Sequence, residues 1–377
     1  MSEPLLPRYG TRSLGEVVPS ILTALGVPGY ANLLDVPPAR AACLLLIDGL
    51  GAELLATHAA DAPFLASLAT GTEPLTAGFP ATTATSIASL GTGLPAGQHG
   101  LTGYTFAVPG AGVLNALTWC SHADGEPVDL RERAVPEQLQ PHDTALARAA
   151  AAGLDVQVVA PPAQHESGLS RAALRGGSFR AVHALGDLAA AVLATTGFCY
   201  AYHGDLDHVG HLYGPGSLPW RLQLSHVDRL VAAIAERLPG GTLLAVVADH
   251  GMVTVTDPVD ADAEPALSGG VRVLAGDPRA RHVHAVPGAA PDVQAAWSEV
   301  LGSRAWVVSR EEAVTAGWFG PVASPVAERI GDVVVAARGG TGVLRRVAEP
   351  RESALVGHHG SLTAAEQLVP FLLAGGL

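Results

Sequence analysis

Aspartate and histidine residues follow apolar or glycine-bounded stretches at four places in this chain. An apolar run such as 243–248 is typical of a buried strand, and α/β proteins place catalytic side chains in the segments after such strands. Carboxylates and imidazoles gathered at strand ends suit divalent metals, and two such clusters suit a two-metal site. The residues concerned are Asp48, Asp207, His211, Asp249, His250, His358 and His359.

Two of these clusters have a spacing that predicts their local geometry. Asp249 and His250 are adjacent, and Gly251 would let the backbone turn close to a metal. Asp207 and His211 lie four positions apart around a glycine, which predicts that both side chains converge in one loop. The chain has 15 histidines, so chance spacing is a real alternative. The position after apolar runs therefore carries more weight than the spacing.

Thr83 is the candidate nucleophile. It stands where a loop containing Pro80 turns into a helix rich in alanine, serine and threonine. Backbone N–H groups at a helix N-terminus favour an anionic phosphate and a developing alkoxide. A coordinated Zn²⁺ would lower the pKa of the hydroxyl group. The structural alternative is that the hydroxyl groups at this helix start only cap and pack the helix. These groups belong to Thr82, Thr83, Thr85 and Ser86.

Strands and helices alternate along most of the chain, which predicts an α/β fold with a mostly parallel central sheet covered by helices on both faces. The expected strands are 41–47, 156–160, 197–202 and 242–248. The expected helices are 13–25, broken at Pro19, and then 53–68, 141–152, 183–195 and 218–238.

The composition of the sequence changes after Asp257, where an acidic, proline-containing segment is typical of a linker. Short strand and helix patterns then alternate, so we expect a small inserted α/β cap at 266–325. The cap would interrupt a catalytic core made of residues 1–265 and 326–377. Residues 330–337 are expected to return the chain to that core as a strand.

Composition excludes several classes of protein. Hydrophobic residues make up 48% of the chain and charged residues 15%, which indicates a well-buried globular protein. A net charge of −13 argues against binding of a nucleic-acid polymer. No apolar stretch reaches the ~20 residues needed to cross a membrane, and no secretion signal is visible. Cys43, Cys120 and Cys199 are expected to be buried thiols, so we predict a cytoplasmic protein.

Several short motifs occur in a known order along the chain. They are Ile47-Asp48-Gly49, Phe79-Pro80-Ala81-Thr82-Thr83, Thr92-Gly93-Leu94-Pro95, His99-Gly100, Asp207 with Gly210-His211, Asp249-His250-Gly251 and His359-Gly360. In these motifs the chain resembles the alkaline phosphatase superfamily, most closely its nucleotide pyrophosphatase/phosphodiesterase-like branch. The resemblance covers most of the expected core. It implies an α/β core that carries an inserted cap and binds two zinc ions.

The resemblance also implies roles for individual residues. Asp207, His211 and His359 would hold one metal. Asp48, Asp249 and His250 would hold the other, and Thr83 would touch that second metal as nucleophile. Mixed Asp/His ligation favours zinc over manganese. His358 is the alternative to its neighbour as a ligand, and His208 is expected to be a loop residue.

The sequence departs from the family at Tyr104, where phosphodiesterases of this branch usually have an asparagine that contacts a phosphate oxygen. A phenol can donate one hydrogen bond to a phosphoryl oxygen, or it can simply pack beside Phe106. Two other branches are disfavoured. The arginine clamp and serine nucleophile of classical phosphatases are not evident around Thr83, and the chain has no lysine of the kind that binds carboxylate in phosphonoacetate-hydrolase relatives.

Two further groups of polar residues could contact a ligand, but groups of this kind are more often ordinary solvated surface. One could line the substrate cleft and comprises His165, Glu166, Ser167, Ser170 and Arg171. The other lies in the expected cap, could meet an anionic or nucleotide tail, and comprises Arg279, Arg281, His282 and His284.

The leading hypothesis is a two-metal hydrolase that cleaves phosphodiester or pyrophosphate bonds of a small organic phosphate or nucleotide through a threonyl-phosphate intermediate. The alternative on the same site is a phosphomonoesterase or phosphonate-ester hydrolase. A metal-dependent binding module without catalysis is disfavoured by the complete set of candidate ligands. A nicotinamide-dependent oxidoreductase is disfavoured because no GxGxxG follows the first strand.

Overall fold

The computed structural model describes residues 3–122 and 126–375, and its largest sheet has six strands in the order β19-β9-β1-β8-β6-β7. β1 (Ala41–Ile47) lies between β9 (Thr242–Val247) and β8 (Phe198–His203), and it pairs with both in parallel. Every residue of β1 is buried, which is why the segment is a continuous apolar run. The predicted mostly parallel α/β fold is confirmed.

The outer strands complete this sheet. β6 (Val156–Ala160) pairs with β8 in parallel, and β7 (Ser178–Ala181) extends the sheet beyond β6. β19 (Phe371–Gly375) is the exception, because it runs antiparallel to β9 at the other edge. The C-terminal residues of the described chain therefore close the sheet that the first third of the sequence begins.

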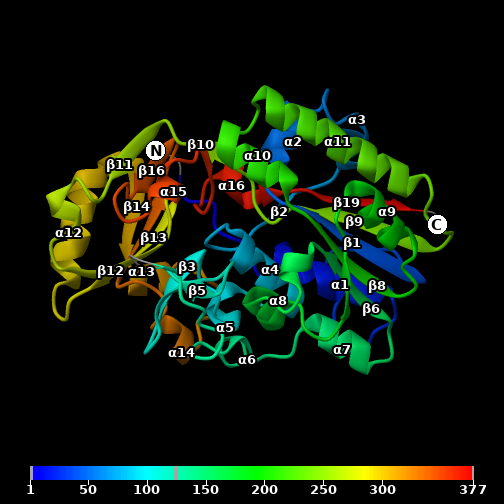
Figure 1. The fold of residues 1–377 in the computed structure, drawn as a ribbon, viewed down its shortest axis with the longest axis horizontal. Coiled ribbons are helices and arrows are strands. Elements are labelled where there is room, and N and C mark those ends of the chain that lie inside the picture. Colours follow the sequence, from blue (N-terminus) through cyan, green and yellow to red (C-terminus); the bar gives the residue numbers. More distant parts are fainter. Residues whose placement is uncertain (1–2, 123–125, 376–377) are drawn as a thin grey trace.

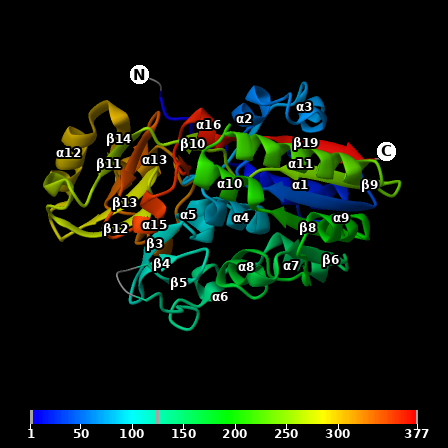
Figure 2. The same ribbon diagram turned by 45° about the horizontal axis from the view of Figure 1, so that its top comes forward.

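Helices cover both faces of the central sheet (Figures 1 and 2). One layer contains α2 (Ala52–Thr57), α3 (Pro63–Ala69), α9 (Leu185–Leu193), α10 (Asp205–Tyr213) and α11 (Leu218–Ala235). The other layer contains α1 (Val17–Ala24), α4 (Thr83–Thr92), α7 (Ala145–Ala151) and α8 (Gly168–Ala173). In Figure 2, α2, α3, α10 and α11 lie toward the top of the view, and α7 and α8 lie toward the bottom.

Two helix predictions need correction. The segment 53–68 forms two helices rather than one, because the chain turns after Thr57 and restarts with Pro63 at the first position of α3. Pro19 does not break α1, since it lies in the first helical turn, where its missing N–H group needs no partner.

A second sheet of four strands forms a separate layer at one end of the molecule (Figure 1). Its order is β12 (Val271–Asp277), β13 (Ala280–Ala285), β15 (Val333–Ala337) and β14 (Ala305–Ser309). α12 (Ala290–Leu301) and α13 (Arg310–Thr315) connect and cover these strands. An α/β module is therefore present where the sequence predicts a cap.

The expected return of residues 330–337 to the core is wrong. β15 pairs with β13 on one side and β14 on the other, so it is an interior strand of the second sheet. Its apolar sequence fits either sheet, and only the pairing distinguishes them. We therefore propose that the inserted module extends past residue 325 to β16 (Thr341–Leu344), which pairs with β11 (Asp257–Asp260) next to that sheet.

A smaller antiparallel sheet lies between the two large ones. It consists of β3 (Thr105–Val108), β4 (Gly112–Asn115) and β5 (Cys120–Ser121). β3 contacts β12 of the second sheet, so this hairpin connects core and insert.

The remaining short elements are η1 (Leu14–Glu16), β2 (Leu75–Thr76), α5 (Ala96–His99), α6 (Pro136–Leu139), η2 (Pro162–Gln164), β10 (Val253–Thr254), η3 (Pro265–Leu267), η4 (Gly302–Arg304), α14 (Ser324–Ala327), α15 (Pro350–Ser353), β17 (Gly357–His358), α16 (Ala364–Gln367) and β18 (Leu368–Val369).

The three cysteines carry free thiols. Cys43 and Cys199 are buried at paired positions of β1 and β8, as predicted, whereas Cys120 is partly exposed. Among the residues that the structure describes, no helix combines the length and the apolar character needed to cross a membrane.

Candidate active site

The candidate metal ligands gather at one edge of the central sheet. Asp48 directly follows β1, Asp249 follows β9, and Asp207 lies in the first turn of α10 after β8. Because β9, β1 and β8 are adjacent and parallel, their carboxyl ends meet at the same edge. Asp207 and Asp249 lie 159 and 201 positions after Asp48 in the sequence. The sheet topology therefore brings together carboxylates that are far apart along the chain.

Asp207, His211 and His359 form the first group, as the sequence predicts. The Nε2 atom of His211 lies 3.3 Å from Oδ2 of Asp207, and the Nε2 atom of His359 lies 3.9 Å from Oδ1 of the same carboxylate. One ligand atom of each residue lies within 4.8 Å of the others. Asp207 and His211 lie on α10 and not in a loop, so their convergence comes from the four-residue spacing on one helix face.

The second group contains His250 at its centre. Its Nε2 atom lies 3.4 Å from Oδ1 of Asp48 and 3.4 Å from Oδ2 of Asp249. Asp48, Asp207 and His250 also form a triad of ligand atoms within 4.8 Å of one another. Asp207 therefore belongs to both groups, which the sequence did not predict. The imidazole rings of His250 and His359 stack with centroids 3.5 Å apart, so the two groups are in direct contact.

Backbone carbonyl groups fix the orientation of all three imidazoles. The Nδ1–H group of His250 donates to the carbonyl oxygen of Gly251 at 2.9 Å. His211 donates in the same way to Gly357 at 2.7 Å, and His359 donates to Ala81 at 2.8 Å. A carbonyl can only accept, so Nδ1 carries a proton and Nε2 is the nitrogen that faces the carboxylates. This is the usual arrangement of histidine ligands.

The carboxylates are oriented by donors and still keep free oxygen atoms. The hydroxyl group of Tyr202 donates to Oδ2 of Asp48 at 2.5 Å, and the amide of Gly49 donates to Oδ1 of Asp249 at 3.0 Å. The opposite oxygen of each carboxylate, and Oδ1 of Asp207, is buried without a hydrogen-bond partner. Buried unpaired carboxylate oxygens are costly, and a divalent cation would satisfy them. These residues therefore fit bound metal ions.

The electrostatics of this cluster also favour bound cations. Burial, followed by the charges of Asp249 and Asp207, holds the pKa of Asp48 well above its usual value. Burial alone would also raise the pKa of Asp207, but the charge and hydrogen bond of His211 hold that pKa below its ordinary value. A cluster of three acidic groups that repel one another is an arrangement that cations stabilise.

Gly49 permits the close approach of the two carboxylate segments. It has a φ of 75°, and a Cβ atom there would lie 3.0 Å from Cβ of Asp207. Gly251 has a different role from the predicted turn beside a metal. A Cβ atom at this position would lie 1.9 Å from the carbonyl oxygen of Ala365, so the glycine is required by packing against the segment that begins α16.

Thr83 is the first residue of α4, as predicted for a nucleophile at a helix start. Its Oγ1 atom lies 3.2 Å from Nε2 of His250. The hydroxyl groups of Thr85 and Ser86 donate to the backbone carbonyls of Leu101 and Asp249, so these two side chains are structural. Thr82 is the N-cap residue but makes no side-chain capping bond.

A cavity of about 240 Å³ opens beside Thr83. Sequence reasoning missed Asp277 and Glu352 in its wall, because neither follows a strand of the central sheet. Burial raises the pKa of Asp277 to about 7. The full lining comprises Thr82, Thr83, Tyr104, Leu117, Asp207, His211, Asp277, Pro278, Glu352, Leu355, His358 and His359.

Tyr104 lines this cavity, but its hydroxyl proton already has an acceptor. It donates to Oε1 of Glu352 at 3.0 Å, and the side-chain amide of Asn115 donates to the phenol oxygen at 2.8 Å. Burial, followed by the charge of Glu352, raises the pKa of Tyr104. The phenol therefore stays protonated and is held by two side chains of the cavity wall.

Two histidines next to the candidate ligands have other environments. His358 lines the cavity, but its Nε2 atom donates to the carbonyl oxygen of Leu355 at 3.1 Å, and burial lowers its pKa to about 4. Its neighbour His359 is the residue that faces Asp207. His208 is exposed and lies on α10, not in a loop.

The two weaker groups of polar residues do not reach this cavity. Arg279 and Arg281 are fully buried and pair with Glu366 at 2.6 Å and Glu349 at 2.7 Å. His282 bonds backbone groups, and His284 lines a different cavity of about 430 Å³ between the insert and the β3–β4 hairpin. His165, Glu166, Ser170 and Arg171 line a third cavity, which shares no residue with that of Thr83.

Comparison with known proteins supports this architecture. The family model for type I phosphodiesterase/nucleotide pyrophosphatase matches residues 42–362. The catalytic subunit of human GPI ethanolamine phosphate transferase 3 is 42% identical over 52 residues, which is 14% of this chain and 5% of that protein. The match therefore spans only a small fraction of the curated relative.

Two solved structures share the fold. Murine ectonucleotide pyrophosphatase/phosphodiesterase 5, in an inactive form in complex with AMP, superposes with a TM-score of 0.68 at 16% identity, covering 89% of this chain and 88% of that chain. Phosphonoacetate hydrolase from Sinorhizobium meliloti, in complex with phosphonoformate, gives a TM-score of 0.67 at 20% identity, covering 92% and 93%. The family model covers most of the chain, so this chain belongs to the type I phosphodiesterase/nucleotide pyrophosphatase family.

Proposed function

We propose that this protein is a metal-dependent hydrolase that cleaves phosphodiester or pyrophosphate bonds of a small organic phosphate through a threonyl-phosphate intermediate. The single observation that carries the proposal is the position of Thr83. Its hydroxyl group stands at the start of α4, within 3.2 Å of His250, at the wall of a cavity that also contains Asp207, His211 and His359.

Two divalent ions are proposed, one on Asp207, His211 and His359, and the other on Asp48, Asp249 and His250 with Thr83. The membership of Asp207 in both groups supports two sites that share a wall. Zinc suits the mixed Asp/His ligands, and manganese is the alternative. Bound there, the ions would lower the pKa of a hydroxyl group or water and offset negative charge on the phosphoryl group.

The residues of the chain supply the rest of the reaction. The oxygen of Thr83 attacks phosphorus, an O–P bond forms, and the bond to the leaving oxygen breaks. Water then attacks the threonyl-phosphate, which restores the hydroxyl group of Thr83 and releases the second product. The backbone N–H groups at the start of α4 are oriented to stabilise negative charge on the phosphoryl oxygens in both steps.

The substrate class and the cellular location of the protein are also proposals. The family assignment favours a phosphoester substrate, and the relatives solved with AMP and with phosphonoformate support a small phosphorus-containing ligand. A cytoplasmic location stays a prediction, supported by the free thiols of Cys43, Cys120 and Cys199.

Hydrolysis of bis(4-nitrophenyl) phosphate and of 4-nitrophenyl phosphate by the zinc-loaded protein tests this function. We expect the diester to be the better substrate, and a strong preference for the monoester would favour the phosphomonoesterase alternative instead. The variant Thr83→Ala should lower kcat by at least about a thousand-fold, as loss of a nucleophile does.

Thr82→Ala is the matched control, because Thr82 is the neighbouring residue in the same cavity wall and, in the described part of the chain, its side chain forms no hydrogen bond with His250. It should keep most of the turnover. Unchanged turnover in the Thr83→Ala variant would remove the proposed mechanism.

A further inference from the structure

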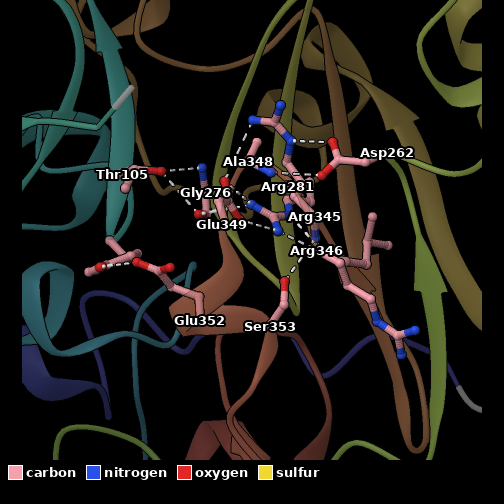
Figure 3. Close-up of polar contacts among 12 residues, drawn as sticks. Thr105, Asp262, Gly276, Arg281, Arg345, Arg346, Ala348, Glu349, Glu352 and Ser353 are labelled. Carbon is pink, nitrogen blue, oxygen red and sulfur yellow. Dashed lines mark hydrogen bonds and ion pairs between the residues drawn. The ribbon is translucent and has the colours of Figure 1, made fainter. Parts of the chain in front are cut away.

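Three arginines in the described part of the chain are more than nine-tenths buried, namely Arg279, Arg281 and Arg329. The first two are paired with carboxylates. Nε and Nη2 of Arg279 donate to Glu366 at 3.0 and 2.6 Å. Nη1 and Nη2 of Arg281 donate to Glu349 at 3.2 and 2.7 Å, as Figure 3 shows. A buried charge is costly unless it is paired, and these two cations have the partner that burial requires.

Arg329 is buried without such a partner. It is 6% exposed, and no carboxylate of the described residues lies within 4.0 Å of its guanidinium nitrogen atoms. Its Nη1 atom donates to the carbonyl oxygens of Gly100 at 2.7 Å and Leu139 at 3.0 Å. The guanidinium group also lies over the ring of Phe106, at 6.0 Å from the centroid. All these groups are uncharged, so the cation is solvated in part but not neutralised.

The charge of Arg329 persists in the folded protein. Burial lowers the pKa of Arg329 to about 10, which still leaves the guanidinium group protonated at neutral pH. The structure therefore places a full positive charge in a buried position and supplies no negative charge next to it among the residues it describes.

One edge of the Arg329 guanidinium group is free. Nε and Nη2 make no hydrogen bond with the described residues, yet neither is among the polar side-chain atoms that are sealed from solvent without a partner. The same edge holds a carboxylate elsewhere in the molecule, since Nε and Nη2 of Arg171 donate to Glu137 at 2.8 and 2.7 Å. Two parallel N–H groups of this kind match the oxygen atoms of a carboxylate or phosphate group.

The free edge belongs to a residue that lines a cavity of about 530 Å³ between α6 and α14. Arg133 is a second cation of this wall, and its Nη2 atom donates only to the carbonyl oxygen of Gly110, at 2.9 Å. Glu328 is the one carboxylate among the described lining residues, and it is exposed. The wall therefore carries more cationic than anionic groups, although the whole chain has a net charge of −13.

We propose that this cavity binds a small organic anion, whose carboxylate or phosphate group pairs with the free edge of Arg329. Val135, Leu139 and Pro325 give the wall an apolar part that suits a hydrocarbon substituent of the ligand. The cavity shares no lining residue with that beside Thr83, so this is a second site and does not depend on the proposed function.

Isothermal titration calorimetry of the zinc-loaded protein with benzoate and with phenylphosphonate tests this proposal. The two probes share a phenyl group and differ in the anionic group, so they distinguish a carboxylate site from a phosphate site. Benzamide is the neutral control. We expect at least one of the anions to bind with a Kd of about 1 mM or lower, and benzamide to bind at least about tenfold more weakly, because it lacks the charge that pairs with Arg329.

Three variants show whether the anion occupies this cavity. Arg329→Gln should weaken binding by at least about tenfold, the usual effect of losing a hydrogen bond to a charged group. That variant also removes two hydrogen bonds to backbone carbonyls, so substitutions at two exposed positions give tests that leave the fold intact. Arg133→Gln should weaken binding by about two- to fivefold, and Glu328→Gln should strengthen it by a similar factor, because it removes a repelling charge.

Arg237→Gln is the matched control, because Arg237 is an exposed arginine on another part of the surface and does not line the cavity. It should leave the affinity unchanged. An anion held at the candidate metal site would be insensitive to all of these substitutions. Equal affinity in the unmodified protein, Arg133→Gln and Glu328→Gln would therefore overturn the proposal. Failure of both anions to bind, or equal binding of benzoate and benzamide, would overturn it as well. None of these results depends on hydrolysis of phosphodiesters, so the proposed function stands or falls separately.

Discussion

Asp207 is the residue on which the candidate metal site depends most. It is the only carboxylate that the geometry places in both groups of ligand atoms found among the described residues. Its Oδ1 atom faces His359, its Oδ2 atom faces His211, and the hydrogen-bond partners of both imidazoles leave Nε2 free. A single carboxylate shared by two proposed sites would make binding of two ions interdependent.

Asp207→Asn should therefore reduce metal binding at both sites. The amide keeps the shape of the side chain but removes the negative charge and one acceptor oxygen. Loss of even an outer-shell partner typically lowers the affinity of a metal site by about 10–100-fold. We expect Asp207→Asn to lower the metal affinity by at least this much. Metal content after dialysis, measured by inductively coupled plasma mass spectrometry, should drop well below that of the unmodified protein.

His208→Ala is the control for this measurement, because His208 is exposed on the same helix as Asp207. Its metal content should not change. Equal metal content in Asp207→Asn and the unmodified protein would contradict the shared role of this carboxylate.

At the scale of elements, α4 positions the candidate nucleophile Thr83 and is tightly packed. All ten of its residues are buried, and it crosses α8 so closely that Gly91 is in contact with the backbone of that helix. A Cβ atom at Gly91 would lie 1.8 Å from the carbonyl oxygen of Ala173. The small residues of this helix, which the sequence shows plainly, are thus explained by close helix packing.

Gly91→Ala should destabilise the protein even though alanine is the better helix former. We expect the free energy of unfolding to fall by about 1–3 kcal/mol, the usual cost of overpacking a buried site. Gly186→Ala in α9 is the matched control, because no atom lies within 4 Å of a Cβ atom placed there. That variant should gain about 0.4–1 kcal/mol. Urea unfolding measures both, and equal effects would show that α4 and α8 can separate at little cost.

At the scale of the whole molecule, the buried residue His282 helps to join the core and the insert. His282 of β13 donates from Nε2 to the carbonyl oxygen of Thr102 in the core, and its Nδ1 atom accepts from the amide of Gly331 in the insert. His99 is also buried, but within the core, where it bonds Ser89 and Leu101. Burial lowers the pKa of each to about 3. Both are therefore neutral in the folded protein at neutral pH.

The protein should lose stability as the pH falls below about 6.5. There the unfolded chain binds protons on these two histidines and the folded chain does not, so protonation favours unfolding. Between pH 6.5 and about 3 each histidine should lower the free energy of unfolding by up to about 1.4 kcal/mol per pH unit. Urea unfolding of metal-free protein at several pH values measures the slope. His282→Gln should reduce it, and parallel slopes for the two proteins would contradict this account.

The sequence was sufficient for features that depend on local pattern. The strands 41–47 and 156–160 are found with these bounds, because fully buried strands are continuous apolar runs. The same pattern located Asp48, Asp207 and Asp249, since the carboxyl ends of parallel strands meet at one edge. Thr83 was found from a helix start, which is also a local signal.

The features decided only by tertiary structure are those that depend on which distant segments pack together. The sheet to which β15 belongs, the position of Asp207 between two groups of ligands, and the acceptor of the Tyr104 proton all follow from such pairings. The cavity wall formed by Asp277 and Glu352 does so as well. The sequence by itself therefore determined the fold class and the candidate catalytic side chains, because strand-end placement is a rule of topology. The environment that selects a substrate arises where insert and core meet, and no local pattern specifies that contact.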